Sequence, residues 1–151
     1  MKLASALSER SDLLERINEL SNRLSDNVRV QEGEKPSEDP YKLVAELSSC
    51  LDRYEYLVLH INMTNNQTVL DGKTLTELLA HREFLTRKIN IYRKVLKSAR
   101  EPYDRYSMKE IKVVLTVSVE DLQKQVDKFS KEYRLCDDQI QALNWATELL
   151  E

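Results

Sequence analysis

Glycine and proline are scarce in this chain, which has two Gly and three Pro among 151 residues. Average usage would give about ten Gly and seven Pro. The scarcity excludes collagen-like proteins, loop-rich proteins and all-β folds with many turns. Long apolar runs are also missing, because no segment approaches the roughly 18 consecutive apolar residues of a membrane-spanning helix. The composition therefore indicates a helical protein, and we do not expect a membrane to be its partner.

A strong excess of one charge is missing as well. The chain has 23 Lys plus Arg against 26 Asp plus Glu, for a net charge of −3, with both signs interspersed. This balance provides neither the basic face of a nucleic-acid-binding protein nor a polybasic segment for anionic lipids. Glu9, Arg10 and Asp12 interrupt the only apolar stretch near the N-terminus, so we expect no signal peptide. A cytoplasmic protein is the resulting prediction.

Metal-binding and catalytic motifs are not found either. Cys50 and Cys136 have no metal-type spacing, and in a cytoplasmic protein they are expected to be small buried side chains. His60 and His81 do not form the Glu-x-x-His pattern of a di-iron bundle, and no nucleotide-binding or zinc-protease motif occurs. We expect no metal, no cofactor and no catalytic residues, and favour a non-enzymatic role.

The five Gly and Pro residues separate four stretches whose apolar residues recur at spacings of three and four, the signature of helices. The spacing predicts helices over 3–27, 40–62, 75–100 and 119–149. Helix-start signals precede three of them: Asp39 followed by Pro40, the capping box of Thr74 and Glu77, and Ser118.

Each of these stretches sustains roughly three to four heptads, which is typical of helices packed at shallow angles. The predicted architecture is all-α: a single domain over 1–151, built as a long four-helix bundle with up-down-up-down topology and coiled-coil-like seams. Val44, Leu51 and Val58 widen the apolar stripe of the second helix, as an intramolecular bundle requires. The alternative is a pair of long helical hairpins completed by a partner chain.

Two short segments have the alternating pattern of strands. Apolar residues alternate with mostly polar neighbours over 110–117, and Val28 and Val30 alternate within 28–31. Because a lone strand leaves its backbone groups unpaired, we expect the two segments to pair as a small two-stranded β element. The alternative for the later segment is an extended crossover.

An internal repeat is suggested by the first and third helices, which align at an offset of 72 residues. The informative match is Arg10 with Arg82, since leucines recur by chance in any heptad pattern. A duplicated helical hairpin would produce this match.

Arg10 and Arg82 are also the most informative polar residues, because an arginine in a helix seam is costly unless it is paired and hydrogen-bonded. Tyr54, Asp137, Asn144 and the Asn/Thr-rich stretch 62–68 are candidate partners. One interpretation is a polar network that sets the helix register. The other is a clamp for a small polar or anionic ligand, whose candidate binding residues are Arg10, Asn62, Thr64, Asn65, Arg82, Asn144 and Trp145.

Several segments resemble one protein family over nearly the whole chain. They are MKLASALSERSDL, VQEGEKPSEDP, INMTNNQT, DGKTLTELLAHREFL and IQALNWATELL. With these the chain resembles the septicolysin-like family of small bacterial helical proteins. The resemblance implies a helical fold, a bacterial origin and, from the family name, a pore-forming haemolysin activity.

The sequence is therefore consistent with three functions. The leading hypothesis is a non-enzymatic, self-associating or protein-interaction module, because extended heptads occur without a catalytic motif; its partners would be further copies of the chain or another protein. The alternatives are the pore-forming activity and the binding of a small polar or anionic ligand at the Arg/Asn residues.

Overall fold

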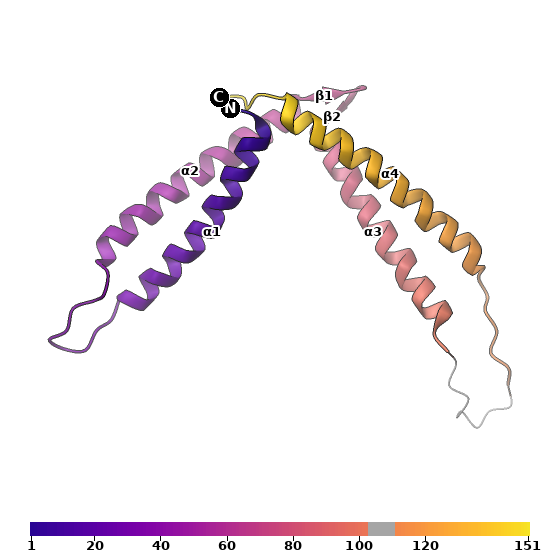
Figure 1. Cartoon of the computed structure of the whole chain (residues 1–151), viewed down its shortest axis with the longest axis horizontal. Coiled ribbons are helices and arrows are strands. Elements are labelled where there is room, and N and C mark those ends of the chain that lie inside the picture. The colour runs from indigo at the N-terminus through magenta and orange to yellow at the C-terminus, as the bar shows by residue number, and fades with distance from the viewer. Residues whose placement is uncertain (103–110) are drawn as a thin grey trace. The chain divides into compact units, whose positions relative to one another are not determined.

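The computed structural model describes residues 1–102 and 111–151, and four helices account for most of them (Figure 1). The helices are α1 (Leu3–Asn27), α2 (Pro40–Gln67), α3 (Leu75–Arg100) and α4 (Val119–Ala146). Two short strands, β1 (Val69–Leu70) and β2 (Lys73–Thr74), lie between α2 and α3. The predicted all-α class with four long helices is confirmed, and α1 and α3 have the predicted bounds.

The described residues form two compact units. The first contains Met1–Thr76 together with Gln141–Glu151, and the second contains Glu77–Ile140. The single domain over 1–151 stays a prediction.

In the first unit, α1 and α2 form an antiparallel hairpin (Figure 1). Glu9 on α1 contacts Arg53 on α2. Arg16, further along α1, contacts Glu46, which comes earlier in α2. Residue numbers therefore rise along one helix as they fall along the other. The side chains between the helices are aliphatic and excluded from water, and include Leu3, Ala6, Leu20, Leu43, Leu57 and Ile61. Burial of each large aliphatic side chain contributes about 1.5–3 kcal/mol, so this seam stabilises the hairpin.

Helix α2 begins as predicted and ends later than predicted. The Asp39 side chain accepts a hydrogen bond from the Tyr41 N–H at 3.0 Å, and Pro40 occupies the first helical position. The helix continues past residue 62 to Gln67 through the Asn/Thr-rich segment. Thr64 and Thr68 donate their hydroxyls to the carbonyls four residues earlier, so these side chains bond within the helix and do not interrupt it.

The small two-stranded element exists, but at a different place from the one predicted. β1 and β2 pair antiparallel, Val69 with Thr74 and Leu70 with Lys73. Neither 28–31 nor 111–117 contains a strand, and residue 110 lies outside the described residues. The physical reason is the turn between the strands: Asp71 (φ 50°) and Gly72 (φ 80°) both have the positive φ of a type I′ turn, which Asp-Gly favours.

Helix α4 ends at Ala146, three residues before its predicted end, because the tail that follows pairs with the N-terminus. The Leu3 N–H donates to the Thr147 carbonyl at 2.9 Å, and the Leu149 N–H donates to the Met1 carbonyl at 2.7 Å. Lys2 and Glu148 complete an antiparallel bridge. The tail thus satisfies an N–H of the first turn of α1 that has no partner within the helix.

In the second unit, α3 and α4 run antiparallel and share an aliphatic seam of Leu78, Leu85, Ile89, Leu96, Val126 and Ile140. The Tyr92 and Phe129 rings meet edge to face, with centroids 5.4 Å apart. Cys136 is buried, as predicted, and its thiol donates to the Leu78 carbonyl at 3.4 Å. Ser118 caps α4, since its hydroxyl accepts from the Asp121 N–H at 3.2 Å, which confirms that start signal.

The two hairpins have matching lengths. α1 and α3 have 25 and 26 residues and start 72 residues apart, and α2 and α4 have 28 residues each. Each hairpin is thus one long helix pair of the same dimensions, as duplication of a helical hairpin would produce.

Candidate functional site

Arg82 contacts one of the partners expected from the sequence. From α3 it donates to the carboxylate of Asp137 on α4, within the second unit. The two side chains are 29% and 32% exposed, so water screens the pair and its contribution is about 0–1 kcal/mol. The contact is what the polar-network interpretation requires for this arginine.

Arg10 lies in the first unit, half-buried on α1. Within residues 1–102 and 111–151, no hydrogen bond or ion pair to its guanidinium is found. Its neighbours on the same face of the helix are Leu7 and Leu14, three residues before and four residues after it. Arg10 is therefore a cation set among apolar side chains.

Thr64 is buried and holds the C-terminal tail. Its hydroxyl donates to the His60 carbonyl at 2.7 Å and accepts from the Leu150 N–H at 3.0 Å. The Thr64 carbonyl accepts both the backbone N–H and the hydroxyl of Thr68. The hydrogen-bonding groups of this predicted ligand residue are therefore engaged in holding the fold.

The other predicted residues of the first unit differ in accessibility. Asn62 and Trp145 are exposed, Trp145 at 66% of its surface, whereas Asn65 is half-buried and Asn144 is buried. A ligand-binding role for the seven residues Arg10, Asn62, Thr64, Asn65, Arg82, Asn144 and Trp145 stays a prediction.

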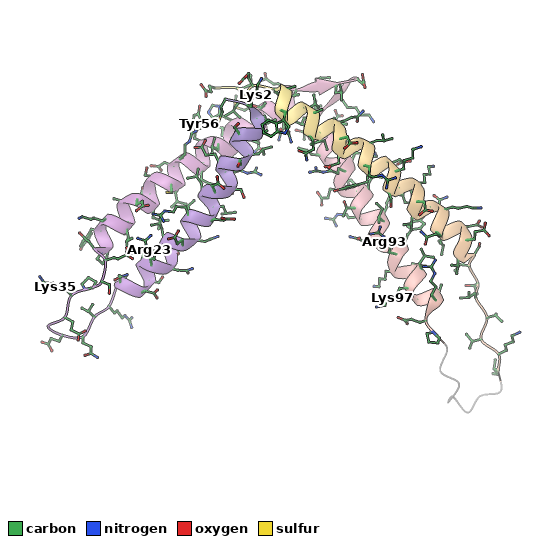
Figure 2. The ribbon with its side chains drawn as sticks, in the orientation of Figure 1. Lys2, Arg23, Lys35, Tyr56, Arg93 and Lys97 are labelled. Carbon is green, nitrogen blue, oxygen red and sulfur yellow. The ribbon has the colours of Figure 1, made fainter. Side chains whose placement is uncertain are left out.

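Sequence reasoning missed a polar ladder that crosses the first unit. Glu9 on α1 accepts two hydrogen bonds from Arg53 on α2, at 2.7 and 2.9 Å. The Arg53 guanidinium lies 5.1 Å from the centroid of the Tyr56 ring, which in turn stacks at 4.0 Å on His60. His60 Nδ1 is 2.7 Å from the Leu150 carbonyl oxygen. The ladder joins α1, α2 and the tail, and Figure 2 labels Tyr56 within it.

The signal for this ladder was present in the sequence. Arg53, Tyr56 and His60 are spaced by three and four residues and so share one face of α2. An arginine three residues before a tyrosine on a helix face is placed for a cation–π contact. The Arg53 hydrogen bonds lower the pKa of Glu9, because they stabilise its carboxylate.

Ion pairs occupy one side of the α1–α2 hairpin, which we call the ionic flank. Arg16 contacts Glu46 and Glu19, and Arg23 contacts Glu38 and Glu19. Hydrogen bonds from Arg23 lower the pKa of Glu38, and the pKa of Arg23 is raised in return. With the Glu9–Arg53 pair, the α1 members of this flank are spaced seven residues apart. Figure 2 labels Arg23 on this hairpin.

Apolar side chains occupy the opposite side of the same hairpin. This apolar flank consists of Leu7 and Leu14 on α1 and Val44 and Leu51 on α2, two pairs each spaced seven residues apart. Helical geometry puts each pair on the side of the seam away from the ion pairs. Leu14, Val44 and Leu51 are 47%, 48% and 46% exposed. The expectation that Val44, Leu51 and Val58 widen the stripe of an intramolecular bundle is therefore wrong for Val44 and Leu51, because neither is covered, whereas Val58 is half-buried.

The second unit carries hollows on one flank of the α3–α4 hairpin. One has a volume of about 310 Å³ and another of about 580 Å³, and Arg93 and Ser130 line both. No group of three His, Cys, Asp or Glu side chains suited to a metal ion occurs in residues 1–102 and 111–151. No helix in that same part of the chain is long and apolar enough to cross a membrane.

Comparison with known proteins gives a family and a solved structure. The model of a family described as "Family of unknown function (DUF6847)" matches residues 10–149. The chain is also similar to a functionally unknown conserved protein from Corynebacterium diphtheriae, known from a crystal structure. The identity is 40%, the TM-score is 0.91, and 99% of each chain is covered. No curated protein matches the sequence.

These findings correct the resemblance drawn from sequence segments. Neither match has any link to septicolysin, so that assignment is wrong and the pore-forming activity implied by its name loses its basis. Two of the quoted segments have structural roles: INMTNNQT is the end of α2 with its first loop residue, and DGKT forms the turn and second strand before α3. Segments with such structural roles do not by themselves establish a family or an activity.

Proposed function

This chain belongs to the DUF6847 family of unknown function, and from that premise we propose that it is a non-enzymatic, self-associating helical module of the cytoplasm. Copies pack through the apolar flank of the α1–α2 hairpin. The observation that carries the proposal is the asymmetry of this hairpin, whose ion pairs lie on one side and whose uncovered aliphatic side chains lie on the other.

The asymmetry has a direct energetic meaning. The ionic flank is stable in water, because its charges are hydrated and paired. The apolar flank gains free energy when it is covered, by about 25 cal/mol for each Å² of apolar surface removed from water. Leu14, Val44 and Leu51 are each close to half exposed, so each has surface left to bury. A second copy carries the same flank and is self-complementary to it in a two-fold dimer.

Arg10 gives such an interface specificity. It lies between Leu7 and Leu14 on the apolar flank, where its guanidinium meets no described partner. A single polar residue in an apolar helix seam lowers stability but selects one register and one number of chains. In a dimer, Arg10 would require an acceptor from the facing copy, which restricts how the two flanks align.

A second exposed stripe supports association as well. On α3, Phe84, Ile91 and Val95 are 63%, 61% and 41% exposed, and Phe84 and Ile91 are seven residues apart. Contiguous exposed apolar residues of this kind mark protein-interaction surfaces. This stripe belongs to the other unit and is a candidate surface for a further copy or another protein.

The test is a pair of matched double variants on α2. In Val44→Glu with Leu51→Glu, two carboxylates enter the apolar flank, so we expect the mass measured by size-exclusion chromatography with light scattering to fall. In the control, Ala45→Glu with Ser49→Glu, the same charges enter the exposed outer face of the same helix, and the mass is expected to equal that of the unmodified chain. Equal masses for both variants would contradict the proposal.

A further inference from the structure

A groove runs along one flank of the α3–α4 hairpin in the second unit. Its narrower part has a volume of about 310 Å³, and a wider part of about 580 Å³ adjoins it through Arg93 and Ser130. These volumes lie in the range of small-molecule sites. Figure 2 labels Arg93 and Lys97 on the α3 side of this hairpin.

The narrower part has an unusual set of lining groups. It contains two guanidinium groups and no carboxylate, with Ile89 as its buried apolar residue. Its remaining residues all carry hydrogen-bond donors: Thr86, Asn90, Ser130 and Tyr133. The pocket is therefore positive and rich in donors, which is the composition that suits an anion.

The two cations, Arg93 from α3 and Arg134 from α4, differ from the other arginines that the structure describes in this unit. Arg82 binds Asp137, Arg87 binds Glu83, and Arg100 donates to the Gln123 side chain. Neither Arg93 nor Arg134 makes an ion pair or side-chain hydrogen bond with any residue in 1–102 or 111–151. Their donors are available within the described part of the chain.

We propose that this groove binds a small organic monophosphate, with its phosphoryl group between Arg93 and Arg134. A guanidinium donates two parallel hydrogen bonds to phosphate oxygens, and two such groups match the charge of a phosphate monoester. The hydroxyls of Ser130 and Tyr133 supply further donors to the remaining oxygens. A carboxylate has only two oxygens and would leave more of these donors without an acceptor.

The wider part of the groove selects the rest of the ligand. Its buried apolar residues are Leu96 and Val126. Apart from the shared Arg93, its charged residues are two cations, Lys97 and Arg100, and two carboxylates, Glu101 and Asp127. Because these charges balance, a second anionic group would gain no net attraction in this part of the groove. The ligand therefore carries a single phosphoryl group and a polar, uncharged remainder.

This site is independent of the proposed self-association. Arg93 follows Ile91 by two residues, which is roughly 200° around a helix of 3.6 residues per turn. The groove and the exposed stripe of Phe84, Ile91 and Val95 therefore lie on nearly opposite sides of α3, and the apolar flank of α1–α2 belongs to the other unit.

Binding is tested on the full chain by isothermal titration calorimetry at low salt. Glycerol 3-phosphate and inorganic phosphate are the probes, and glycerol and succinate are the comparisons. We expect saturable binding of glycerol 3-phosphate, tighter than that of phosphate, with no binding of glycerol and weaker binding of succinate. If glycerol 3-phosphate shows no saturable binding with a dissociation constant of about 1 mM or below, the proposal is overturned.

Matched variants identify the site. Arg93→Gln and Arg134→Gln each remove a charged donor pair and are expected to weaken binding about tenfold or more. Lys94→Gln and Lys131→Gln remove the same charge from exposed positions outside the groove and are expected to leave the affinity unchanged. Equal weakening by all four would mean nonspecific attraction and would refute the site.

Asp127→Asn supplies a readout that a merely structural role would not produce. The variant removes a carboxylate that lines the wider part of the groove together with Arg93, while keeping an acceptor for the Gln123 amide, which donates to Asp127 at 3.0 Å. Affinity for glycerol 3-phosphate is expected to rise. A lower affinity in a variant that retains the native melting temperature would count against the proposed position of the phosphoryl group.

Discussion

The backbone N–H of Leu150 donates to the Thr64 hydroxyl at 3.0 Å, which joins the last residues of the chain to the middle of the sequence. The hydroxyl donates in turn to the His60 carbonyl, and the His60 ring lies 2.7 Å from the Leu150 carbonyl oxygen. Leu150 is thus held through both its N–H and its carbonyl. The tail is part of the fold of the first unit, and its loss would leave buried groups of α2 without partners.

Replacing Thr64 with valine tests this attachment. The change preserves the shape of the side chain but leaves the Leu150 N–H without an acceptor, so the free energy of unfolding should fall by about 1–3 kcal/mol. Urea denaturation measures the loss, and amide exchange of Leu150 should accelerate. The control is Thr68→Val, which removes only the bond from the first residue after α2 to the Thr64 carbonyl. Losses of the same size in both variants would contradict the account.

The pH dependence of stability tests the ion pairs of the first unit. Hydrogen bonds from Arg53, Arg23 and Lys2 lower the pKa values of Glu9, Glu38 and Glu148 below 4.5 in the folded chain. The unfolded chain then binds more protons at acidic pH, so the stabilisation is present above pH 4.5 and is lost as pH falls through the lowered pKa values. The urea midpoint should stay level from neutral pH to about pH 5 and fall below it.

Substitution shows which carboxyl groups cause this fall. Glu9→Gln removes one of the carboxylates with a lowered pKa and should make the fall of the urea midpoint at acidic pH less steep. Glu15→Gln, on the exposed face of the same helix, should leave this fall unchanged. A fall of identical steepness in the two variants would mean that Glu9 does not contribute.

The turn between β1 and β2 depends on a glycine. Gly72 has φ +80° and open space around its α-carbon, so an alanine there meets no atom but adopts a disfavoured backbone conformation. Gly72→Ala should cost about 1–2 kcal/mol, and about 2–4 °C in melting temperature follows for each kcal/mol at this chain length. Asp71→Asn, at φ 50°, should be tolerated because asparagine adopts this region readily. An unchanged melting temperature for Gly72→Ala would contradict the turn assignment.

The contact between Arg82 and Asp137 separates the two interpretations of the seam arginines. If the contact is structural and screened, a double-mutant cycle with Arg82→Met and Asp137→Asn should give a coupling energy of about 0–1 kcal/mol. Thermal stabilisation by glycerol 3-phosphate should persist in Arg82→Met, because the proposed site lies at other residues. Loss of that stabilisation would instead support a ligand clamp that includes Arg82.

Local signals in the sequence predicted the helices well. The bounds of α1 and α3 follow from apolar spacing, and Asp39 and Ser118 cap their helices as expected, because these interactions involve residues close together in the chain. The place of the strands was not predicted, because alternating apolar residues over 110–117 favoured a strand there, whereas the strands that form flank the Asp71–Gly72 turn. The end of α4 was not predicted because it depends on pairing with residues at the far end of the chain.

The candidate sites were predicted less well, for a physical reason. Asp137 was among the partners expected for Arg82, but the contacts of Thr64 with Leu150 and of Arg53 with Glu9 depend on which helices and tails meet. Heptad spacing likewise identifies apolar residues without showing which of them the chain covers. Val44 and Leu51 widen the apolar stripe of the second helix in the sequence and are exposed on the hairpin.

Sedimentation equilibrium of the unmodified chain over a wide range of concentrations tests the central claim most directly. If copies associate through the apolar flank, the mass should rise with concentration above the 17.7 kDa of one chain and approach a whole multiple of it. A mass that stays at 17.7 kDa at every concentration would contradict the account.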